Sequence, residues 1–376
     1  MLIACNARFL IKNKLEGIGW FTYESLKHIV TSHPEHEFAF FFDRKFDKEF
    51  LFAPNVRGYV LNPPARHPLL WKIWFDYSVP RMLKKLNADI FISTDGFASL
   101  KTNCKQVVVM HDLAFEHFDD HVPKNVLKYY RKYSPLFSKK ATRIATVSTF
   151  TKNDIAERYQ ISADKIDIVY NGSNKKFHPI SEEEKIAVKK NFADGKNYFV
   201  YAGAIHPRKN TARLFKSFDE YKTQTSSDMK LLIAGRKAWS TDEAMKVFEA
   251  MKHKNDIVFL GHLERNELAQ VMAAATALVY VSLFEGFGIP IVEAMNCDVP
   301  VITSKTSSMP EVAGNAALLV NPLSEKEIVS ALRIMSEDES CRQELISVAR
   351  NQRTLFSWEQ TGNRLWDCIM KAVAKS

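Results

Sequence analysis

Two carboxylates flank a glycine turn in the second half of the chain. The segment Glu285-Gly-Phe-Gly-Ile-Pro-Ile-Val-Glu293 follows an apolar run, residues 277–281, that is typical of a buried strand, and it opens a segment of helical character. A turn of this kind leaves backbone N–H groups free at the positive end of the helix dipole, where anions bind. We interpret the stretch as the binding site of an anionic ligand whose hydroxyl groups contact Glu285 and Glu293. The pattern also fits a tight turn with one acidic residue at the helix start and another exposed.

Two adjacent cations, Arg208 and Lys209, follow another expected strand of the same half, residues 198–202. An Arg fork and a Lys point charge together complement a diphosphate. A solvated Arg-Lys pair in a loop is common, so the pair alone is a weak signal. It gains weight because both segments would lie at strand carboxyl ends of one sheet and could hold one ligand.

His111 and Asp112 stand at the carboxyl end of a strand expected in the first half, Val107–Met110. Ligands of open α/β sheets bind beyond the carboxyl ends of strands, and a His beside an Asp suits polar contact or acid/base work. A lone histidine is more often structural, but the pair at a strand end favours a functional interpretation.

Gly17 and Gly19 lie between the first expected strand, Leu2–Cys5, and a helix. This order resembles the phosphate-binding turn of a nucleotide fold, although G-x-G lacks the third glycine of that motif. The two glycines could equally serve only to bring a ligand or another domain close to the backbone.

Strand-like and helix-like segments alternate in two consecutive series. The expected strands are residues 2–5, 37–42, 56–60, 89–93, 107–110, 143–147, 166–170, 198–202, 229–234, 257–260, 277–281, 299–303 and 317–320. The expected helices are residues 20–30, 69–86, 123–139, 151–159, 211–221, 242–251, 265–275, 325–336, 340–354 and 358–374. The fold class is therefore α/β, with two doubly wound, Rossmann-like parallel sheets and a cleft between them.

Residues 173–195, rich in Lys and Glu, are expected to be a linker region with a short helix. We therefore place an N-terminal domain at residues 1–175 and a second domain at residues 176–356. Residues 357–376 form a final amphipathic helix, and its position in the chain does not say which domain it packs on.

Composition indicates a globular protein of 376 residues with 46% hydrophobic and 25% charged residues. The longest nearly apolar run, residues 271–284, is shorter than the ~20 residues that a membrane-spanning helix needs. We expect neither an anchor nor a signal peptide, because the apolar start carries Asn6 and Arg8 and lacks a cleavage site. Five scattered cysteines without a C-x-x-C pair favour a reducing cytosol over a disulfide framework or a zinc site.

All of the net charge of +9 resides in the first half of the chain. Residues 1–180 contain 27 Lys and Arg against 18 Asp and Glu, whereas the remainder contains 25 of each. Residues 69–86 mix Trp and Phe with Lys and Arg, as an interfacial helix on anionic lipid does. An amphipathic core helix with a solvated basic end is the commoner outcome, and solubility alone could explain the charge.

Together these segments resemble the retaining nucleotide-sugar glycosyltransferases of the GT-B fold, in the large family called family 4 or group 1. The resemblance covers nearly the whole chain. Glu285 to Glu293 matches the specific E-x7-E signature of that family, and Gly17-Ile-Gly19 matches its N-terminal glycine loop. Further matching segments follow in the order and spacing of the family: His111-Asp-Leu, Thr146-Val-Ser148, Val169-Tyr-Asn-Gly172, Pro207-Arg-Lys-Asn210 and Ala234-Gly235.

The resemblance implies a role for each matching residue. Glu293 would bind the ribose of the donor nucleotide, and Glu285 would contact the donor sugar. Arg208 and Lys209 would hold the diphosphate, and His111 would face the sugar across the cleft. Backbone contacts to sugar and phosphate would come from Phe287, Gly288 and Ile289, with Gly17, Gly19 and Gly235 in the glycine loops. The first domain would bind the acceptor, the second would bind the donor, and the helix from Trp358 would cross back to the first domain.

The sequence departs from the family pattern at two positions. Many members carry a diphosphate-binding Arg directly after the glycine that corresponds to Gly203, and here that residue is Ala204. Arg208 could take over its role, and Lys209 is the more secure phosphate ligand. Trp20 stands where relatives often have Arg, so contacts to acceptor or donor there would differ.

The expected function is transfer of a hexose, with mannose from GDP-mannose as first choice, to a glycan or lipid-linked acceptor of the cell surface. With no D-x-D motif and no metal cluster in the sequence, we expect no cofactor and no metal, because cations and the helix dipole can stabilise the leaving diphosphate. A cytoplasmic protein, peripheral on the inner face of an anionic membrane through its basic first domain, fits the charge.

Two alternatives to a glycosyltransferase stay open. An epimerase or phosphorylase on the same two-domain fold would also keep the cleft. A non-catalytic nucleotide-sugar-binding protein is disfavoured because Glu285, His111 and Lys209 are all present. Nucleic-acid binding is not expected, since no aromatic-basic stacking platform stands out.

Overall fold

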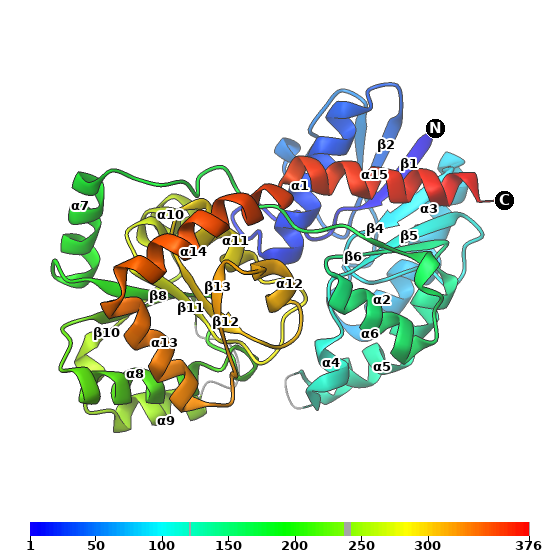
Figure 1. The fold of residues 1–376 in the computed structure, drawn as a ribbon. Coiled ribbons are helices and arrows are strands. Elements are labelled where there is room, and N and C mark those ends of the chain that lie inside the picture. The colour runs from blue at the N-terminus through cyan, green and yellow to red at the C-terminus, as the bar shows by residue number, and fades with distance from the viewer. Residues whose placement is uncertain (120–121, 237–241, 376) are drawn as a thin grey trace. The chain divides into compact units, whose positions relative to one another are not determined.

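A computed structural model describes the chain except for residues 120–121, 237–241 and 376. The chain divides into two compact units, each with its own parallel sheet (Figure 1). Unit 1 consists of residues 1–172 and 357–376, and unit 2 consists of residues 173–356. The chain thus passes from unit 1 to unit 2 just after Gly172 and returns after Phe356.

Unit 1 is built on a parallel sheet in the order β3-β2-β1-β4-β5-β6-β7. Its strands are β1 (Leu2–Asn6), β2 (Glu37–Phe42), β3 (Val56–Val60), β4 (Ile90–Ser93), β5 (Lys105–Met110), β6 (Arg143–Thr146) and β7 (Ile166–Ile168). The central strands read as continuous apolar runs because helices cover both faces of the sheet, so side chains of either direction are buried. The chain order reverses between β1 and β4, which makes this the topological switch point of unit 1.

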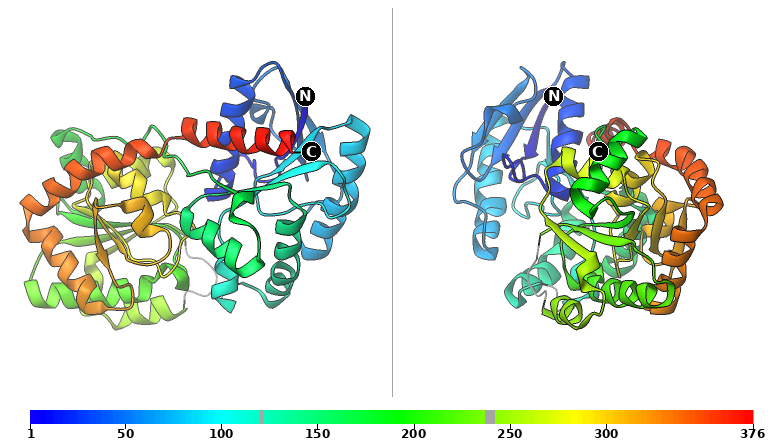
Figure 2. Two further views of the ribbon diagram at one scale, coloured as in Figure 1. Left: turned by 45° about the vertical axis from the view of Figure 1, so that its right-hand side comes forward. Right: turned by 90° about the vertical axis from the view of Figure 1, so that its left-hand side faces the viewer.

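Helices of unit 1 include one from the far end of the chain. They are α1 (Gly17–Ser32), α2 (Pro68–Ile73), α3 (Val79–Leu86), α4 (Ala114–His117), α5 (Lys124–Lys140), α6 (Thr149–Tyr159) and α15 (Trp358–Ala374). Helix α15 lies beside α1, with β5 and β6 beneath it (Figure 2). Its Thr361 hydroxyl donates to the Tyr170 carbonyl over 2.6 Å, and Lys371 Nζ lies 2.7 Å from Asp167 Oδ1. These bonds assign the C-terminal helix to unit 1.

The expected helix at residues 69–86 is helical throughout but not uniform. A π-helical turn, Trp74–Ser78, separates α2 from α3. Trp74, Phe75 and Asp76 of this turn are buried, and the Asp76 carboxylate accepts from the Leu100 backbone N–H over 2.9 Å. The segment therefore packs Trp74 and Phe75 into the core of unit 1 and leaves its Lys and Arg exposed.

Unit 2 repeats the arrangement with a parallel sheet in the order β10-β9-β8-β11-β12-β13. Its strands are β8 (Tyr198–Ala202), β9 (Lys230–Ala234), β10 (Ile257–Gly261), β11 (Ala277–Tyr280), β12 (Val301–Ser304) and β13 (Ala317–Val320). Its helices are α7 (Glu182–Ala193), α8 (Thr211–Thr225), α9 (Asp242–Ala250), α10 (Arg265–Ala273), α11 (Ile289–Asn296), α12 (Met309–Ala313), α13 (Glu325–Glu337) and α14 (Glu339–Gln352). The switch point of this sheet lies between β8 and β11.

The short helix expected within residues 173–195 is helix α7 of unit 2. Helix α7 starts at a capping box, in which Ser181 accepts from the Glu184 N–H and Glu184 accepts from the Ser181 N–H. It packs against α10 and β9, so the segment is a structural part of unit 2.

Two Rossmann-like parallel sheets confirm the predicted fold class. Within the described residues, no helix is both long and apolar enough to cross a membrane.

Candidate active site

A cluster of one carboxylate and two cations occupies the switch point of unit 2. Lys209 Nζ lies 2.5 Å from Glu285 Oε1, and Arg208 Nη1 lies 3.0 Å from Glu285 Oε2 and 2.6 Å from the Phe284 carbonyl. The loops that follow β8 and β11 meet here because the two strands are neighbours in the sheet. The structure therefore brings Glu285 onto two adjacent cations that precede it by 77 and 76 positions in the sequence.

Local sequence explains the position of the two cations. Arg208 and Lys209 sit on a 3-10 turn that begins with Pro207 and ends at Asn210, which has a left-handed φ of 61°. The Asn210 amide donates to the Val281 carbonyl over 3.0 Å, at the end of β11. This bond ties the cation-bearing loop to the strand that leads to Glu285.

Glu285 is buried, and its carboxylate remains ionised at neutral pH. Burial alone would raise the pKa of this carboxyl group, but the charges of Lys209 and Arg208 outweigh burial and hold its pKa at about 2. The cluster consequently carries one net positive charge, two cations against one carboxylate.

Tyr280 completes the cluster, and the sequence analysis does not single it out. Its hydroxyl lies 2.8 Å from Lys209 Nζ and 2.9 Å from Glu285 Oε1. Burial and the charge of Glu285 raise the pKa of Tyr280 well above its usual value, so the hydroxyl keeps its proton. It can accept from Lys209 while it donates to Glu285, which fixes both side chains relative to one another. The apolar run of β11 hides this residue among core positions.

The glycine turn leads into α11 as the sequence predicts. Gly288 is the N-cap of α11 with a left-handed φ of 98°, a conformation that favours glycine, and Ile289 is the first helical residue. The Ser308 hydroxyl lies 2.8 Å from the Glu285 carbonyl and 3.1 Å from the Phe287 carbonyl, and hydrogen bonding to these carbonyls holds the turn in place. The Phe287 side chain is buried against Phe356, which leaves its backbone as the part that a ligand could reach.

Glu293 lies in the middle of α11, separate from the Glu285 cluster. It is only 6% exposed. Burial raises the pKa of Glu293 to about 7, against the opposing charge of Arg265. A buried carboxylate of this kind suits a ligand that brings hydroxyl donors.

Gly235 is required by a close approach of two loops. A Cβ at this position would stand 1.8 Å from the Gly203 carbonyl oxygen, and no side chain fits there. The loop after β9 thereby packs directly on the loop after β8, which leads to Arg208 and Lys209. Gly235 thus shapes the loop beside the cluster.

In unit 1, His111 follows β5 and has a defined tautomer. Its Nε2 lies 2.8 Å from the Thr94 carbonyl, which can only accept, so Nε2 carries the proton and Nδ1 is an acceptor. Burial lowers the pKa of His111, although the Thr94 carbonyl and Asp112 oppose this, and the ring is therefore neutral at pH 7. The Phe21 ring packs edge-on against it with centroids 5.0 Å apart.

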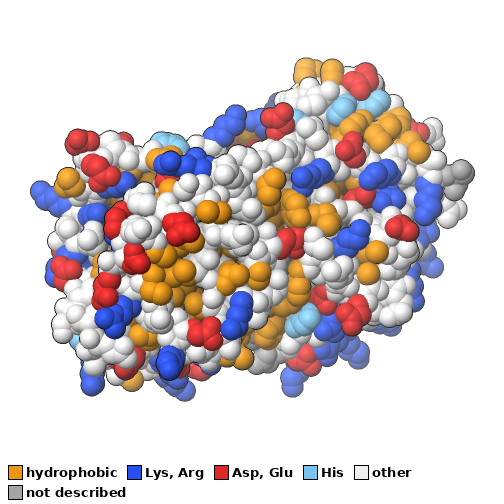
Figure 3. All heavy atoms as spheres, in the orientation of Figure 1, with side chains coloured by type: hydrophobic (Ala, Val, Ile, Leu, Met, Phe, Trp, Pro, Cys, Tyr) orange, Lys and Arg blue, Asp and Glu red, His pale blue; other side chains and the backbone are white. Residues whose placement is uncertain are grey.

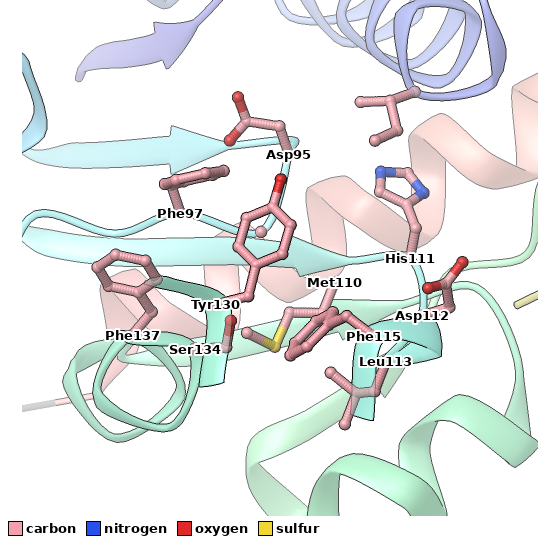
Figure 4. A pocket seen from close by; sticks show the side chains of 12 residues that line it. Asp95, Phe97, Met110, His111, Asp112, Leu113, Phe115, Tyr130, Ser134 and Phe137 are labelled. Atoms are coloured by element: carbon pink, nitrogen blue, oxygen red, sulfur yellow. The ribbon is translucent and has the colours of Figure 1, made fainter. Parts of the chain in front are cut away.

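A pocket opens beside His111 in unit 1 (Figure 4). Its walls include Asp95, Phe97, Phe115 and Tyr130, together with His111 itself. The sequence analysis does not single out Asp95, because nothing local indicates that the turn after β4 borders a cavity.

The two glycines of the N-terminal loop differ in their surroundings. A Cβ on Gly19 would stand 3.1 Å from the Phe9 carbonyl and 3.2 Å from Leu15, so packing of the preceding loop explains this glycine. A Cβ on Gly17 would meet nothing within 4 Å. Gly17 begins α1, and its predicted ligand contact stays a prediction.

Within the described ranges, no group of three His, Cys, Asp or Glu side chains is arranged to hold a metal ion. The polar groups at both switch points are instead cations, carboxylates and hydroxyls that contact one another.

Two family models match the chain. The model for glycosyl transferases group 1 matches residues 182–352, and the model for Glycosyltransferase Family 4 matches residues 16–176. The first match falls within unit 2 and contains the Glu285 cluster, and the second contains His111 and the unit 1 pocket.

Individual proteins agree with the family models. O-antigen chain mannosyltransferase B of Escherichia coli is 28% identical over 362 residues, which is 93% of this chain and 94% of that protein. O-antigen chain mannosyltransferase RfbU of Salmonella typhimurium is 32% identical over 285 residues, 75% of this chain and 74% of that protein.

Solved structures show the same fold at lower identity. Sucrose-phosphate synthase from Thermosynechococcus elongatus superposes with a TM-score of 0.79 at 17% identity, over 100% of both chains. Anabaena HepE in complex with UDP-glucose superposes with a TM-score of 0.76 at 17% identity, over 99% of this chain and 100% of that one. The chain therefore belongs to the group 1, family 4 glycosyltransferases and is a hexosyltransferase.

Proposed function

We propose that the protein transfers mannose from GDP-mannose, with retention of anomeric configuration, to a glycan or lipid-linked acceptor in the assembly of a cell-surface polysaccharide. The observation that carries this proposal is the cluster of Glu285, Lys209, Arg208 and Tyr280 at the start of α11. Its net positive charge suits a nucleoside diphosphate. The two mannosyltransferases of O-antigen chains, at 28% and 32% identity, support mannose as the sugar.

The reaction exchanges one bond at the anomeric carbon for another. The bond from this carbon to the donor phosphate breaks, a bond to an acceptor hydroxyl oxygen forms, and the acceptor proton passes to the departing phosphate. Negative charge grows on the diphosphate as the bond breaks. Arg208, Lys209 and the backbone N–H groups of the 286–288 turn would stabilise that charge, an effect that reaches several kcal/mol in enzymes.

Front-face transfer suits Glu285 better than a double displacement does. A carboxylate with a pKa of about 2, held by two cations and a tyrosine hydroxyl, is weakly basic and a weak nucleophile. It also cannot act as a general acid near neutral pH. We therefore assign Glu285 to contact the donor sugar and to orient the two cations, rather than to form a covalent intermediate.

The remaining predicted contacts divide between the two units. Glu293 would accept hydrogen bonds from the ribose hydroxyls once its carboxyl group is ionised. His111 would accept a hydrogen bond from a sugar hydroxyl at Nδ1, since Nε2 already donates to the Thr94 carbonyl. Gly288, Ile289 and the backbone of Phe287 would approach sugar and phosphate.

Metal independence is part of the proposal. The cations of the cluster and the N-terminus of α11 would stabilise the leaving diphosphate in place of a divalent ion. Transfer is then expected to persist in the presence of EDTA and to gain little from added Mg²⁺ or Mn²⁺.

A panel of nucleotide sugars tests the donor. The purified protein is heated with GDP-mannose, UDP-glucose, UDP-galactose and UDP-N-acetylglucosamine in turn, and then assayed for transfer to mannosylated glycan. GDP-mannose at ~100 times its dissociation constant should add about 2.7 kcal/mol to stability. Stabilisation and transfer with a UDP-sugar alone would reject GDP-mannose as the donor.

We also propose that unit 1 binds an anionic membrane surface. Helices α2 and α5 pack together, and Lys72 of α2 and Lys132 of α5 both lie within 6 Å of the Tyr133 ring centre. Leu69 and Tyr77, on the same helical segment as Lys72, are exposed apolar groups that could contact lipid. The face drawn in Figure 3 mixes basic and acidic side chains over both units, so it carries no field of one sign.

Liposome flotation tests the membrane proposal. The full chain should bind vesicles with 30% phosphatidylglycerol at low salt and release them as salt rises. Replacement of Lys72 and Lys132 by Glu should weaken binding, whereas the same change at Lys246 and Lys252 of unit 2 should not. Equal partitioning to neutral and anionic vesicles would contradict the proposal.

A further inference from the structure

We propose that Ser308 is a positioning residue for the donor diphosphate. Its hydroxyl holds two carbonyls of the glycine turn and thereby aims the N–H groups of Gly286 and Gly288 at the phosphate oxygens. The inference rests on the proposed binding of a nucleoside diphosphate at the start of α11, and it assigns the direction of the turn amides to a residue outside the E-x7-E segment. Three observations within unit 2 carry it: a row of hydroxyls along the turn, the alternation of the peptide groups beside them, and the use that Ser308 makes of its hydroxyl.

A row of hydroxyl side chains lies along the backbone that leads from β11 to α11. Strand β12 pairs with β11 in parallel, with Thr303 opposite Tyr280, so the loop after β12 runs beside the loop after β11. The hydroxyl contacts, in chain order, are Thr303 with the Tyr280 carbonyl (2.8 Å), Ser304 with the Ser282 carbonyl (2.6 Å), Thr306 with the Leu283 carbonyl (3.2 Å), Ser307 with the Glu285 N–H (3.0 Å), and Ser308 with the Glu285 and Phe287 carbonyls (2.8 and 3.1 Å). Every hydroxyl side chain from residue 303 to residue 308 therefore contacts the backbone of the segment that carries Glu285.

The peptide groups just before the turn face two opposite sides. A planar trans peptide points its carbonyl and the N–H that follows in opposite directions. The Phe284 carbonyl accepts from Arg208 Nη1 over 2.6 Å, and the next N–H, that of Glu285, donates to the Ser307 hydroxyl over 3.0 Å. The Leu283 N–H also donates toward the cation-bearing loop, to the Arg208 carbonyl over 2.8 Å. One side of this backbone thus faces the loop after β12, and the other side faces the loop that carries the two cations.

Ser308 sets the direction of two peptide groups in the turn itself. Its hydroxyl lies within hydrogen-bond distance of the carbonyls of Glu285 and Phe287, so both carbonyls face the loop after β12. Because these peptides are planar, the N–H groups that follow, those of Gly286 and Gly288, point toward the side of the two cations. Backbone N–H groups that converge on one side form a site for an anion. Ser308 is 0% exposed, so water does not compete for the two carbonyls.

Helix capping does not explain the Ser308 hydroxyl. Ser308 is the N-cap residue of α12, a position at which a serine usually accepts a hydrogen bond from an N–H of the first turn. Within the described residues, the Ser308 side chain makes no capping bond to its own helix. Ser324, the N-cap residue of α13, does make one and accepts from the Glu327 N–H over 3.2 Å. The Ser308 hydroxyl is therefore used on the glycine turn instead of on α12.

Charge and direction come from different residues at the start of α11. Arg208 and Lys209 supply positive charge, whereas the turn supplies N–H donors whose direction is set before a ligand arrives. Donors that need not reorganise stabilise the charge of a transition state better than mobile ones do. Loss of the Ser308 hydroxyl keeps these donors but lets them turn. Its effect should thus be smaller than the roughly 10²–10³-fold loss that follows removal of a donor.

Ser308→Ala tests the inference, with Ser324→Ala as the matched control. Ser308→Ala should lower the turnover number of sugar transfer about tenfold but GDP affinity only about threefold, because negative charge on the diphosphate grows in the transition state. Ser324→Ala removes a helix cap and should lower stability without a change in either value. Urea unfolding compares the stability of the two variants. A turnover number of Ser308→Ala equal to that of the unmodified protein would overturn the inference.

Nuclear magnetic resonance of the full chain gives a second measurement, which begins with the unmodified protein. Phe287-Gly288 is the only Phe-Gly dipeptide in the sequence, so carbonyl labelling of Phe combined with nitrogen labelling of Gly identifies the Gly288 amide. Its resonance should shift when GDP is added. The shift should be smaller in Ser308→Ala and should keep its size in Ser324→Ala, whereas a role in stability alone would leave it the same in all three proteins. A Gly288 amide that does not respond to bound GDP would overturn the inference.

The same experiments separate this inference from the proposed function. If Glu285→Gln lowers transfer from GDP-mannose and Ser308→Ala does not, the proposed function stands and the inference fails. If UDP-glucose alone supports transfer, GDP-mannose fails as the donor. Titration of the Gly288 amide with UDP then tests Ser308 in the same way, because both nucleotides carry a diphosphate.

Discussion

The two switch points share one arrangement of strands but differ in charge. In unit 1 the loops after β1 and β4 bring one cation, Arg8, to one carboxylate, Asp95. In unit 2 the loops after β8 and β11 bring two cations, Arg208 and Lys209, to Glu285. The first pair is neutral and surrounded by aromatic rings, whereas the second cluster keeps one positive charge. The fold thus decides where a ligand binds, and a few loop residues decide which charge it carries.

Burial differs in the same direction. The side chains of Arg8 and Asp95 are 6% and 1% exposed, but those of Arg208 and Lys209 are 20% and 15% exposed. A ligand can reach Arg208 and Lys209 and replace Glu285 as their ion-pair partner. Arg8 is too buried for a ligand to replace Asp95 in the same way. We therefore expect mutations at the unit 1 pair to affect stability first and mutations at the unit 2 cluster to affect activity first.

Arg8→Met should give the largest loss of stability. It leaves Asp95 buried without its cation, a change that costs about 3–5 kcal/mol in other proteins. Urea unfolding followed by tryptophan fluorescence reports this, because five of the six tryptophans belong to unit 1. Arg131→Met, which breaks an exposed pair with Asp119, should leave the urea midpoint almost unchanged.

A double variant separates lost packing from the stranded charge. Arg8→Met combined with Asp95→Asn should recover part of the stability, because no charge is left buried. If the single Arg8→Met variant unfolds at the same urea concentration as Arg131→Met, the contrast in burial has no energetic meaning.

Glu285→Gln should give the largest loss of activity. It keeps the shape of the cluster but leaves both cations unneutralised, so GDP should bind at least as tightly as before. Transfer should fall by about 10²–10³-fold, the range for loss of one charge-stabilising group in an active site. Isothermal titration with GDP and a transfer assay measure the two effects. Glu249→Gln, an exposed carboxylate paired with Lys254, is the control, and unchanged turnover of Glu285→Gln would remove Glu285 from the mechanism.

The sequence predicts the fold well because backbone elements follow local patterns. Apolar runs bounded by polar turns give the strands Glu37–Phe42 and Ala317–Val320 at their observed bounds, and amphipathic spacing does the same for Trp358–Ala374. The meeting of Arg208 and Lys209 with Glu285 also follows, since strand carboxyl ends share one edge of a sheet. Their direct ion pairing is a side-chain property that strand order does not specify.

The residues that sequence analysis misses act through distant partners. Tyr280 reads as one more apolar position of β11, and only its hydroxyl distances reveal its contact with Glu285. Asp95 and Arg8 are 87 residues apart, and neither local sequence indicates that their loops meet. For Ser173 to Gly195 the composition predicts a linker region with a short helix, and it does not indicate that this helix, α7, packs on α10 of unit 2.

Glu293→Gln should change how the stability of the protein depends on pH. The folded-state pKa of Glu293 is raised to about 7 from 4.5, so its contribution to stability is present below pH 4.5 and is lost as pH rises to 7. Above pH 7 the buried charge destabilises the fold by about 3 kcal/mol, as an order of magnitude. The variant should therefore melt higher than the unmodified protein at pH 8 and at the same temperature at pH 4.5.

The affinity for the donor nucleotide should change with pH in the direction opposite to the stability of the fold. Ribose hydroxyls donate to the ionised carboxylate, so GDP affinity of the unmodified protein should fall as pH drops below 7, and binding should release protons. Titrations in two buffers of different ionisation enthalpy measure this release. Glu293→Gln should show weak, pH-independent binding; equal proton release in both proteins would place the linkage elsewhere.

Tyr280→Phe should give the smallest effect, because it removes one hydroxyl from a cluster that keeps its charges. The turnover number should fall by about three- to tenfold with little change in GDP affinity, since Lys209 and Glu285 stay paired but lose their common partner. Tyr198→Phe is the matched control: that buried hydroxyl donates to the Val271 carbonyl over 2.7 Å, away from the cluster. Both variants should lose similar stability. If the Tyr280 hydroxyl acted only through stability, the two variants would therefore have similar turnover numbers. A fall confined to Tyr280→Phe would show that unit 2 needs its cations oriented as well as present, whereas the ion pair of unit 1 is already fixed by burial.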